Sequence, residues 1–144
     1  MRRRVFLISV GALAIGAMSR ARADAMQDAM QAVLDGAKPR EGRVSIDLPP
    51  LVENGNTVPF TVKVESPMSA QDYVRAIHVF NEKNPQPNIA SFELGPRAGR
   101  AAVATRIRLA DSQTVVALAQ MSDGSWWSGT AHVIVTIAAC TETV

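Results

Sequence analysis

Cysteine is almost absent from this 144-residue chain, in which Cys140, four residues from the carboxyl terminus, is the only one. A single thiol excludes an internal disulfide and a Cys-x-x-Cys redox or zinc pair. Aromatic residues make up only 5% of the chain, and histidine occurs only at His78 and His132. Gly-rich phosphate loops, internal repeats and low-complexity stretches are also missing. These absences remove disulfide scaffolds, nucleotide-binding folds and repeat proteins from consideration.

The first 23 residues have the pattern of an export signal. Residues 2–4 are arginines, residues 5–18 are largely apolar, and Ala21-Arg22-Ala23 fits a small-x-small cleavage site. Arg3-Arg4-Val5-Phe6-Leu7 also resembles the twin-arginine pattern, whose route carries folded cargo. We therefore expect a twin-arginine signal peptide at residues 1–23 and a periplasmic mature protein. A retained membrane anchor is disfavoured, because the apolar run of 14 residues falls short of the roughly 20 that span a bilayer.

Removal of this signal would reverse the net charge, which is +2 for the full chain. Five of the 15 basic residues lie in the first 23, whereas all 13 acidic residues lie beyond them. The mature chain would carry ten basic and 13 acidic residues, a net charge of −3. A domain of that charge lacks the basic surface of nucleic-acid-binding proteins. We expect no nucleic-acid partner, and no membrane association after signal removal.

The remaining chain is expected to form one domain, residues 24–137, followed by a cysteine-bearing arm, residues 138–144. Apolar residues at helical spacing predict a helix over residues 24–36, with Asp24 as its cap and Gly36 at its end. Alternating or apolar segments then predict strands at residues 43–48, 58–64, 76–80, 90–94, 101–109, 114–121 and 131–138. The predicted fold is all-β: an immunoglobulin-like antiparallel β-sandwich with a short N-terminal α-helix.

Three of the predicted strands are apolar on both faces, at residues 76–80, 115–119 and 133–137. A strand with one face in water should alternate polar and apolar side chains. Either the N-terminal helix and loops cover the second face, or a partner subunit lies on it. Trp126 and Trp127 are adjacent, so one is expected to face the core and the other the opposite side. The outward tryptophan either lies under a loop or binds a partner.

The residue inventory argues against metal and nucleophilic chemistry. A blue-copper site needs two His, one Cys and a weak axial ligand such as Met, but neither His nor Met follows Cys140. His78 and His132 lie in apolar strands, where hydrogen-bonded sheet histidines are expected. An extended run of eight residues would hold His132 roughly 25 Å from Cys140. We expect no metal, no cofactor and no catalysis by this chain alone. Cys140 remains either an attachment point for a covalent group or a small buried residue that closes the last strand.

An ordered set of segments resembles the SoxY family of bacterial thiosulfate-oxidation proteins. The set consists of Glu41-Gly42-Arg43-Val44, Asn54-Gly55-Asn56-Thr57-Val58-Pro59, Glu65-Ser66-Pro67-Met68, Asn84-Pro85-Gln86-Pro87, Thr105-Arg106-Ile107-Arg108-Leu109, Gln113-Thr114-Val115-Val116-Ala117, Met121-Ser122-Asp123-Gly124-Ser125 and Val135-Thr136-Ile137. The resemblance implies an immunoglobulin-like periplasmic sulfur carrier whose thiol, here Cys140, holds sulfur intermediates covalently. It also implies a heterodimer with a SoxZ-type sandwich subunit. Its transient partners would be a sulfur-oxidising c-type cytochrome, a sulfate-releasing hydrolase and a sulfane dehydrogenase.

The arm departs from the family pattern. In place of Gly-Gly-Cys-Gly-Gly, this chain has Ala138 and Ala139 before Cys140, and Thr141 and Glu142 begin a tail of four residues after it. Alanine and threonine are bulkier and stiffer than glycine, and a carboxylate near a thiol disfavours the thiolate. The alternative function is therefore a divergent scaffold or binding sandwich that carries no sulfur, with the thiol buried or in an intermolecular disulfide.

Overall fold

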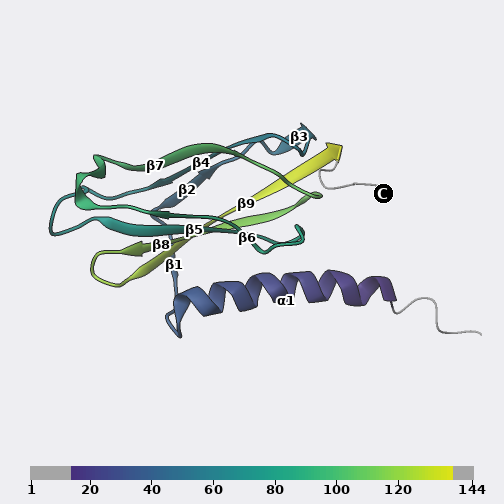
Figure 1. The fold of residues 1–144 in the computed structure, drawn as a ribbon, viewed down its shortest axis with the longest axis horizontal. Helices are drawn as coiled ribbons and strands as arrows, with labels where there is room; N and C mark the ends of the chain where they lie inside the picture. The colour runs from purple at the N-terminus through teal and green to yellow at the C-terminus, as the bar shows by residue number, and fades with distance from the viewer. Residues whose placement is uncertain (1–13, 138–144) are drawn as a thin grey trace, which may run out of the picture.

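The structure is a computed structural model that describes the backbone of residues 14–137 and the side chains of residues 24–137. Its described strands form two sheets, as Figure 1 shows. The larger sheet has the order β1 (Arg40–Glu41), β9 (Trp126–Ile137), β8 (Gln113–Met121), β5 (Val74–Asn81) and β6 (Asn88–Glu93), with β3 (Leu51–Asn54) also beside β9. The smaller sheet has the order β2 (Val44–Asp47), β4 (Val58–Val64) and β7 (Ala101–Ile107). A 3₁₀ turn, η1 (Pro96–Ala98), links β6 to β7.

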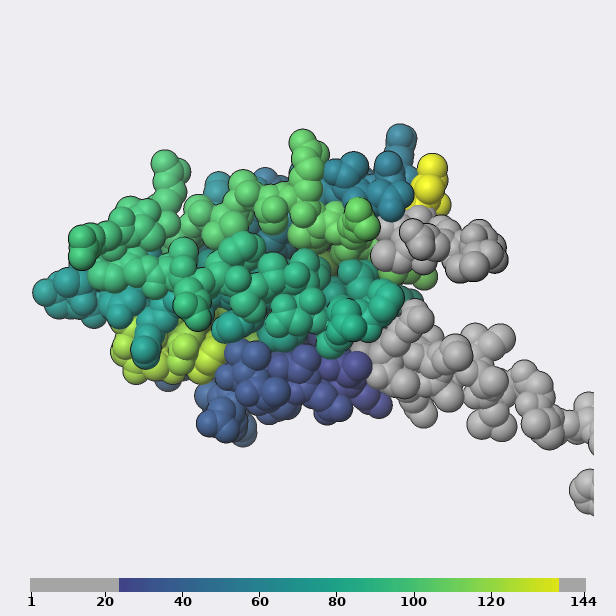
Figure 2. Space-filling model, in the orientation of Figure 1, coloured from purple at the N-terminus to yellow at the C-terminus, as the bar shows by residue number. Residues whose placement is uncertain are grey.

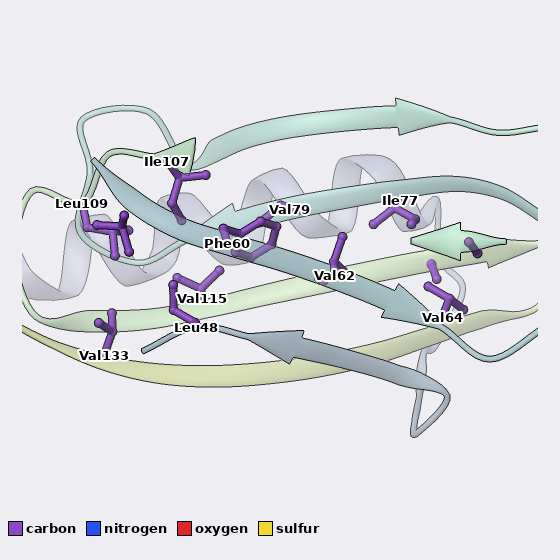
Figure 3. Close-up of a cluster of buried hydrophobic side chains, with 14 of the residues drawn as sticks. Leu48, Phe60, Val62, Val64, Ile77, Val79, Ile107, Leu109, Val115 and Val133 are labelled. Atoms are coloured by element: carbon purple, nitrogen blue, oxygen red, sulfur yellow. The ribbon is translucent and has the colours of Figure 1, made fainter. Parts of the chain in front are cut away.

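The hydrophobic core lies between the two sheets (Figure 3). In β4, every second side chain is buried, and Val58, Phe60 and Val62 are at most 2% exposed. They pack against Ile77 and Val115 of the larger sheet. Burying a side chain of this size contributes about 1.5–3 kcal/mol, so the alternating buried side chains of β4 hold the smaller sheet against the larger one. The predicted all-β, immunoglobulin-like sandwich is confirmed.

Helix α1 (Ala14–Leu34) packs against the outer face of the larger sheet, the face directed away from β4 (Figures 1 and 2). Its Met26 and Leu34 join a second apolar cluster with the sheet residues Phe80, Val116, Leu118 and Trp126. The helix therefore explains why β5 and β8 are apolar on both faces. Trp127 packs against the core between the sheets, so the two tryptophans occupy opposite faces as predicted.

The helix begins earlier than the sequence pattern indicated. It runs without a break from Ala14 to Leu34, so Asp24 lies inside it and does not cap its start. Its end agrees with the prediction, because Asp35 and Gly36 adopt positive φ angles of 48° and 84°. In the described part of the chain, no helix combines the length and hydropathy required to span a bilayer. Signal cleavage after residue 23 stays a prediction.

The antiparallel pairing expected for the sandwich has an exception at one edge of the larger sheet, where both β1 and β3 lie parallel to β9. These strands have two and four residues, too few to show a period of two. The first predicted strand therefore ends at Leu48, and no strand is predicted over Leu51–Asn54. Strand β9 starts at Trp126, five residues before the predicted start.

Candidate functional site

The arm that carries the thiol lies outside the residues that the structure describes. This holds for Cys140 and for its predicted neighbours Ala138, Ala139, Thr141 and Glu142, whose roles stay predictions. The structure defines the point from which that arm continues, which is Ile137 at the end of β9. The environment of Ile137 is therefore the part of the candidate site that lies within the described residues.

The end of β9 is held from both sides. On one side it pairs with β3, and the Thr136 hydroxyl donates to the carbonyl oxygens of Val52, at 3.4 Å, and Glu53, at 3.2 Å. On the other side the backbone N–H of Val135 donates to the Ser112 hydroxyl at 2.8 Å. Finally, the N–H of Gly55 donates to the Ile137 carbonyl at 2.9 Å. These bonds give the arm a fixed origin on the sandwich.

Apolar side chains are exposed around this origin. Leu51, Ile134 and Ile137 have exposed fractions of 60%, 52% and 64%, and Leu51 is the register partner of Ile134. Three strands were expected to be apolar on both faces. Helix α1 packs on β5 and β8, whereas β9 keeps exposed apolar side chains at its end. Leu51 and Ile134 lie on the outer face of the sheet, whereas Ile137 has the parity of the buried Val133 and Val135. Exposed apolar side chains of this kind are a feature of protein-binding surfaces.

A cleft of about 460 Å³ lies between β6 and β7, the edge strands of the two sheets. Figure 2 looks onto this edge, with the green residues of β7 above the teal residues of β6. Ile89, Phe92 and Ile107 give the cleft apolar walls, and Arg106 and Arg108 give it two cationic groups. Both arginines are exposed, and neither forms an ion pair with any residue in the described range.

The loop between β5 and β6 is fixed against the end of β7 by two asparagines. Asn81 is 1% exposed, and its side-chain amide donates to the carbonyls of Gln86, at 2.8 Å, and Pro87, at 3.2 Å. The Asn84 side chain donates to the Arg108 carbonyl at 2.8 Å. These bonds set the separation of the two cleft walls. The sequence analysis used residues 84–87 and 105–109 only as features of the family resemblance and did not predict the cleft. A gap between two sheet edges produces no periodic pattern in the sequence.

The two histidines are hydrogen-bonded sheet residues, as predicted. His78 Nδ1 lies 2.8 Å from the Ser91 hydroxyl, and His132 Nδ1 lies 3.3 Å from the Thr114 hydroxyl. Burial lowers the pKa of His78, and the charge of Glu93 raises it by a smaller amount. Within the described residues, no three His, Cys, Asp or Glu side chains lie close enough together to hold a metal ion.

Comparison with solved structures shows the same fold in other proteins. The sulfur carrier protein SoxY from Chlorobium limicola f thiosulfatophilum superposes with a TM-score of 0.67 at 30% identity, covering 80% of this chain and 99% of that one. The superoxide reductase neelaredoxin from Ignicoccus hospitalis has a TM-score of 0.58 at 18% identity, covering 65% of this chain and 80% of its own. The superoxide reductase from Nanoarchaeum equitans has a TM-score of 0.55 at 12% identity, covering 67% and 99%.

At such low identities the superoxide reductases share the fold alone, while the SoxY structure is also related in sequence. Among curated proteins, none matches this chain. The family model described as "Sulfur oxidation protein SoxY" matches residues 30–140, from the end of α1 through all the strands to Cys140. The family match and the 30% identity to a SoxY structure agree on one conclusion: this chain belongs to the SoxY family.

Proposed function

We propose that this protein is the periplasmic sulfur-carrier subunit of a thiosulfate-oxidation system and holds its cargo covalently on Cys140. The observation that carries the proposal is the family match, which extends to residue 140 and so includes the only cysteine. The SoxY protein of Chlorobium limicola f thiosulfatophilum, similar over 80% of this chain, is described as a sulfur carrier. Export by the twin-arginine route is the predicted way in which the folded protein reaches the periplasm.

The anchored end of β9 supports a carrier role. A carrier must present its thiol to several enzymes in turn, and a segment that starts at a fixed point of a rigid sandwich has a defined reach. Residues 138–144 begin where four hydrogen bonds hold β9 to its neighbours. The chain contributes the nucleophilic thiol and the point of covalent attachment, while separate enzymes supply the catalysis.

The proposed chemistry on Cys140 proceeds in steps, each carried out by a separate enzyme. A c-type cytochrome oxidises the thiolate and thiosulfate by two electrons, forming a bond between the cysteine sulfur and the outer sulfur of thiosulfate. A hydrolase then adds water across the terminal S–S bond, which releases sulfate and two protons and leaves a persulfide anion on Cys140. A sulfane dehydrogenase oxidises the outer persulfide sulfur to a sulfonate, with oxygen atoms taken from water and the electrons passed to the enzyme's own acceptor, and a second hydrolysis releases it as sulfate and restores the thiolate. The chain itself supplies neither electrons nor a general base.

The partner that we propose for stable association is a SoxZ-type sandwich subunit. The exposed side chains of Leu51 and Ile134, which are register partners, and of Ile137 support such an association, because they leave apolar surface beside the origin of the arm. Water is removed from apolar side chains at protein interfaces, and this favours binding. No nucleic acid is expected as a partner, since the mature chain would be acidic.

The test replaces Cys140 with serine in cells that depend on thiosulfate oxidation. We expect Cys140→Ser to abolish thiosulfate consumption while the melting temperature and partner binding stay as in the wild type. In parallel, intact-mass measurement without reductant, on protein from thiosulfate-grown cells, should find thiosulfonate or polysulfur adducts that peptide mapping assigns to Cys140.

Two outcomes would reject the carrier role. The first is normal thiosulfate oxidation by the Cys140→Ser strain. The second is a wild-type protein that, in actively oxidising cells, contains only free thiol or a Cys140–Cys140 disulfide. Either result would favour the alternative, a divergent scaffold or binding sandwich. A buried thiol would be recognised separately, since its loss would then lower the stability by roughly 1 kcal/mol or more.

A further inference from the structure

We propose that the free edge of β7 is a strand-addition site for an acidic, extended segment of another protein. The segment would pair with the backbone of Ala102, Ala104 and Arg106, while arginine side chains beside the strand bind its carboxylates. Such a site would act independently of Cys140 and therefore goes beyond the carrier function. Three features of β7 support it: the direction of its backbone groups, the space beside it and its charge.

Strand β7 pairs only with β4, since the smaller sheet has the order β2, β4 and β7. In an antiparallel ladder, each residue directs its N–H and carbonyl to the same side, and successive residues alternate sides. The N–H of Glu65, directly after β4, donates to the carbonyl of Arg43, directly before β2. The second and fourth residues before Glu65, Lys63 and Thr61, therefore also bond toward β2. The residues between them, such as Val62, bond toward β7.

The register carries this alternation onto β7. Val62 lies opposite Val103, so Val103 directs its N–H and carbonyl toward β4. Its neighbours of the other parity, Ala102, Ala104 and Arg106, direct theirs to the free edge. Within residues 24–137, these free-edge groups have no hydrogen-bond partner. Unpaired backbone groups along an edge strand are a template for pairing with another chain.

The next position along this edge is already paired by a side chain. The Asn84 amide nitrogen donates to the carbonyl of Arg108, and the Asn84 amide oxygen accepts from the N–H of Ala110, both at 2.8 Å. Arg108 and Ala110 have the parity of Arg106, so these bonds agree with the direction derived for the free groups. One side-chain amide thus pairs with the edge as the peptide groups of a neighbouring strand would. An added segment would continue this pairing toward the start of β7.

The space beside β7 can receive a strand. The cleft of about 460 Å³ borders the second half of β7, and inward side chains of an added segment would enter it and contact Ile89, Phe92 and Ile107. On the outer face, Ala102 and Ala104 carry only methyl groups and leave room for neighbouring side chains. Figure 2 shows this edge with no other described segment over β7. A segment with apolar residues at every second position would fit both faces.

Charge selects the kind of segment. Four of the ten basic residues that follow residue 23 lie within residues 94–110, which contain no acidic residue. These four are exposed and form no ion pair with a described residue; they are Arg97, Arg100, Arg106 and Arg108. Opposite charges on neighbouring strands stabilise their pairing. Acidic side chains at either end of an added segment would therefore find cationic partners.

A second copy of this chain fits the edge less well than an acidic segment. If two copies paired β7 with β7 in antiparallel orientation about Ala104, Arg100 of each copy would lie opposite Arg108 of the other. Like charges directly opposite each other are destabilising, and cationic side chains on an edge strand protect it from self-pairing. The arginines thus oppose self-association but leave the edge open to an acidic partner.

The experiment titrates the purified ¹⁵N-labelled protein with the peptide acetyl-Glu-Val-Thr-Val-Thr-Val-Glu-amide. Its valines share the face directed to the cleft, and its glutamates are six residues apart, as Arg100 and Arg106 are. We expect amide shifts at Ala102, Ala104 and Arg106, and slower hydrogen exchange of these amides. Two further peptides, N-methylated on the threonines or on the valines, keep the charge. The one whose methyl groups face β7 should not bind.

Variants of the protein separate pairing from charge. Ala104→Pro removes a free N–H without removing a bond to β4, and proline is accepted on edge strands in this position. Its affinity for the peptide should fall about tenfold. Arg106→Gln should weaken binding about fivefold. The matched control is Lys38→Gln, an exposed position beside β1 at the other edge of the larger sheet, which should leave the affinity unchanged.

The inference is overturned if the unmodified peptide at millimolar concentration shifts no β7 amide, since the arginines would then only block edge pairing. It is also overturned if both N-methylated peptides bind like the parent, or if Lys38→Gln weakens binding as much as Arg106→Gln, because the attraction would then be charge alone. Self-association through β7 in sedimentation would assign the edge to a second copy. If Ala104→Pro fails to fold, the N-methylated peptides provide the same test.

The outcome is separate from that of the carrier proposal, because the titration does not involve the thiol. Cys140→Ser protein should bind the peptide with unchanged affinity. Failure of the carrier function is recognised independently by normal thiosulfate oxidation in the Cys140→Ser strain.

Discussion

Gly129 provides the sharpest test of how the two sheets are packed. It lies in β9 opposite Ala117, where β2 of the other sheet approaches closely. A methyl group placed on Gly129 would lie 2.5 Å from the carbonyl oxygen of Val44 and 3.0 Å from its Cγ1. Val44 is paired with Val64 in the smaller sheet, so its backbone cannot yield without disturbing that ladder.

The expected cost of Gly129→Ala follows from this geometry. Forced overpacking typically costs 1–3 kcal/mol, and an obstacle made of paired backbone places this variant near the upper end, at about 3 kcal/mol. For a domain of this size, 1 kcal/mol corresponds to about 4 °C, so the melting temperature should fall by about 12 °C. Thermal unfolding followed by circular dichroism measures the change directly.

The matched control is Gly95→Ala, the same substitution where a methyl group meets nothing within 4 Å. Gly95 has a φ of −129°, which any residue adopts, so the variant should be neutral or more stable by up to about 1 kcal/mol. A melting temperature for Gly129→Ala within about 2 °C of the wild type would refute the packing argument. Equal destabilisation of both variants would refute it as well, since the loss would then come from removing a glycine.

Three further variants test other parts of the structure. Leu34→Ala should lower the unfolding free energy by about 2–4 kcal/mol in urea titrations, because Leu34 is only 4% exposed between helix and sheet; an unchanged midpoint would mean that the helix does not dock there. Asn81→Ala should cost about 2–3 kcal/mol, because the carbonyl of Gln86 and the N–H of Asn84 lose their partner and the Pro87 carbonyl keeps only its bond from the backbone N–H of residue 81; a loss below about 0.5 kcal/mol would contradict this loop geometry. Because burial lowers the pKa of His78 below 6.5, its contribution is complete above that pH and is lost as the pH falls through its folded pKa. Between about pH 7 and 5 the wild type should therefore lose more stability than His78→Gln, and parallel pH profiles would exclude this effect.

The elements that could be predicted from the sequence are those in which a regular apolar pattern continues over many residues. Strand β4 shows why, since its alternating Val58, Phe60 and Val62 carry the signal of a half-buried strand over seven residues. The two short strands beside β9 could not be found in the same way. Their positions depend on long-range parallel pairing, such as Leu51 with Ile134, and local propensity contains no information about a partner more than 80 residues away.

The candidate site was predictable only in part, for a different reason. Cys140 is conspicuous because it is the only thiol, and its identification needs no three-dimensional information. The cleft requires Arg106 from one sheet edge and Phe92 from the other to face a common space, and their proximity arises from the way η1 carries the chain between sheets. The apolar pattern of β5 and β8 indicated that both faces are buried, but it could not say whether a helix or a partner subunit covers the outer face. The structure shows that helix α1 covers it.

Strand β9 pairs with β8 on one side and with β1 and β3 on the other, and this arrangement also affects the order in which the molecule can fold. Residues 40–54 must wait for residues 127–137 before β1 and β3 acquire a partner, and such distant pairings slow folding. A nascent chain that stops before β9 leaves the apolar strand β8 without its neighbour on one side. The larger sheet can therefore be completed only once synthesis has reached Ile137, three residues before Cys140.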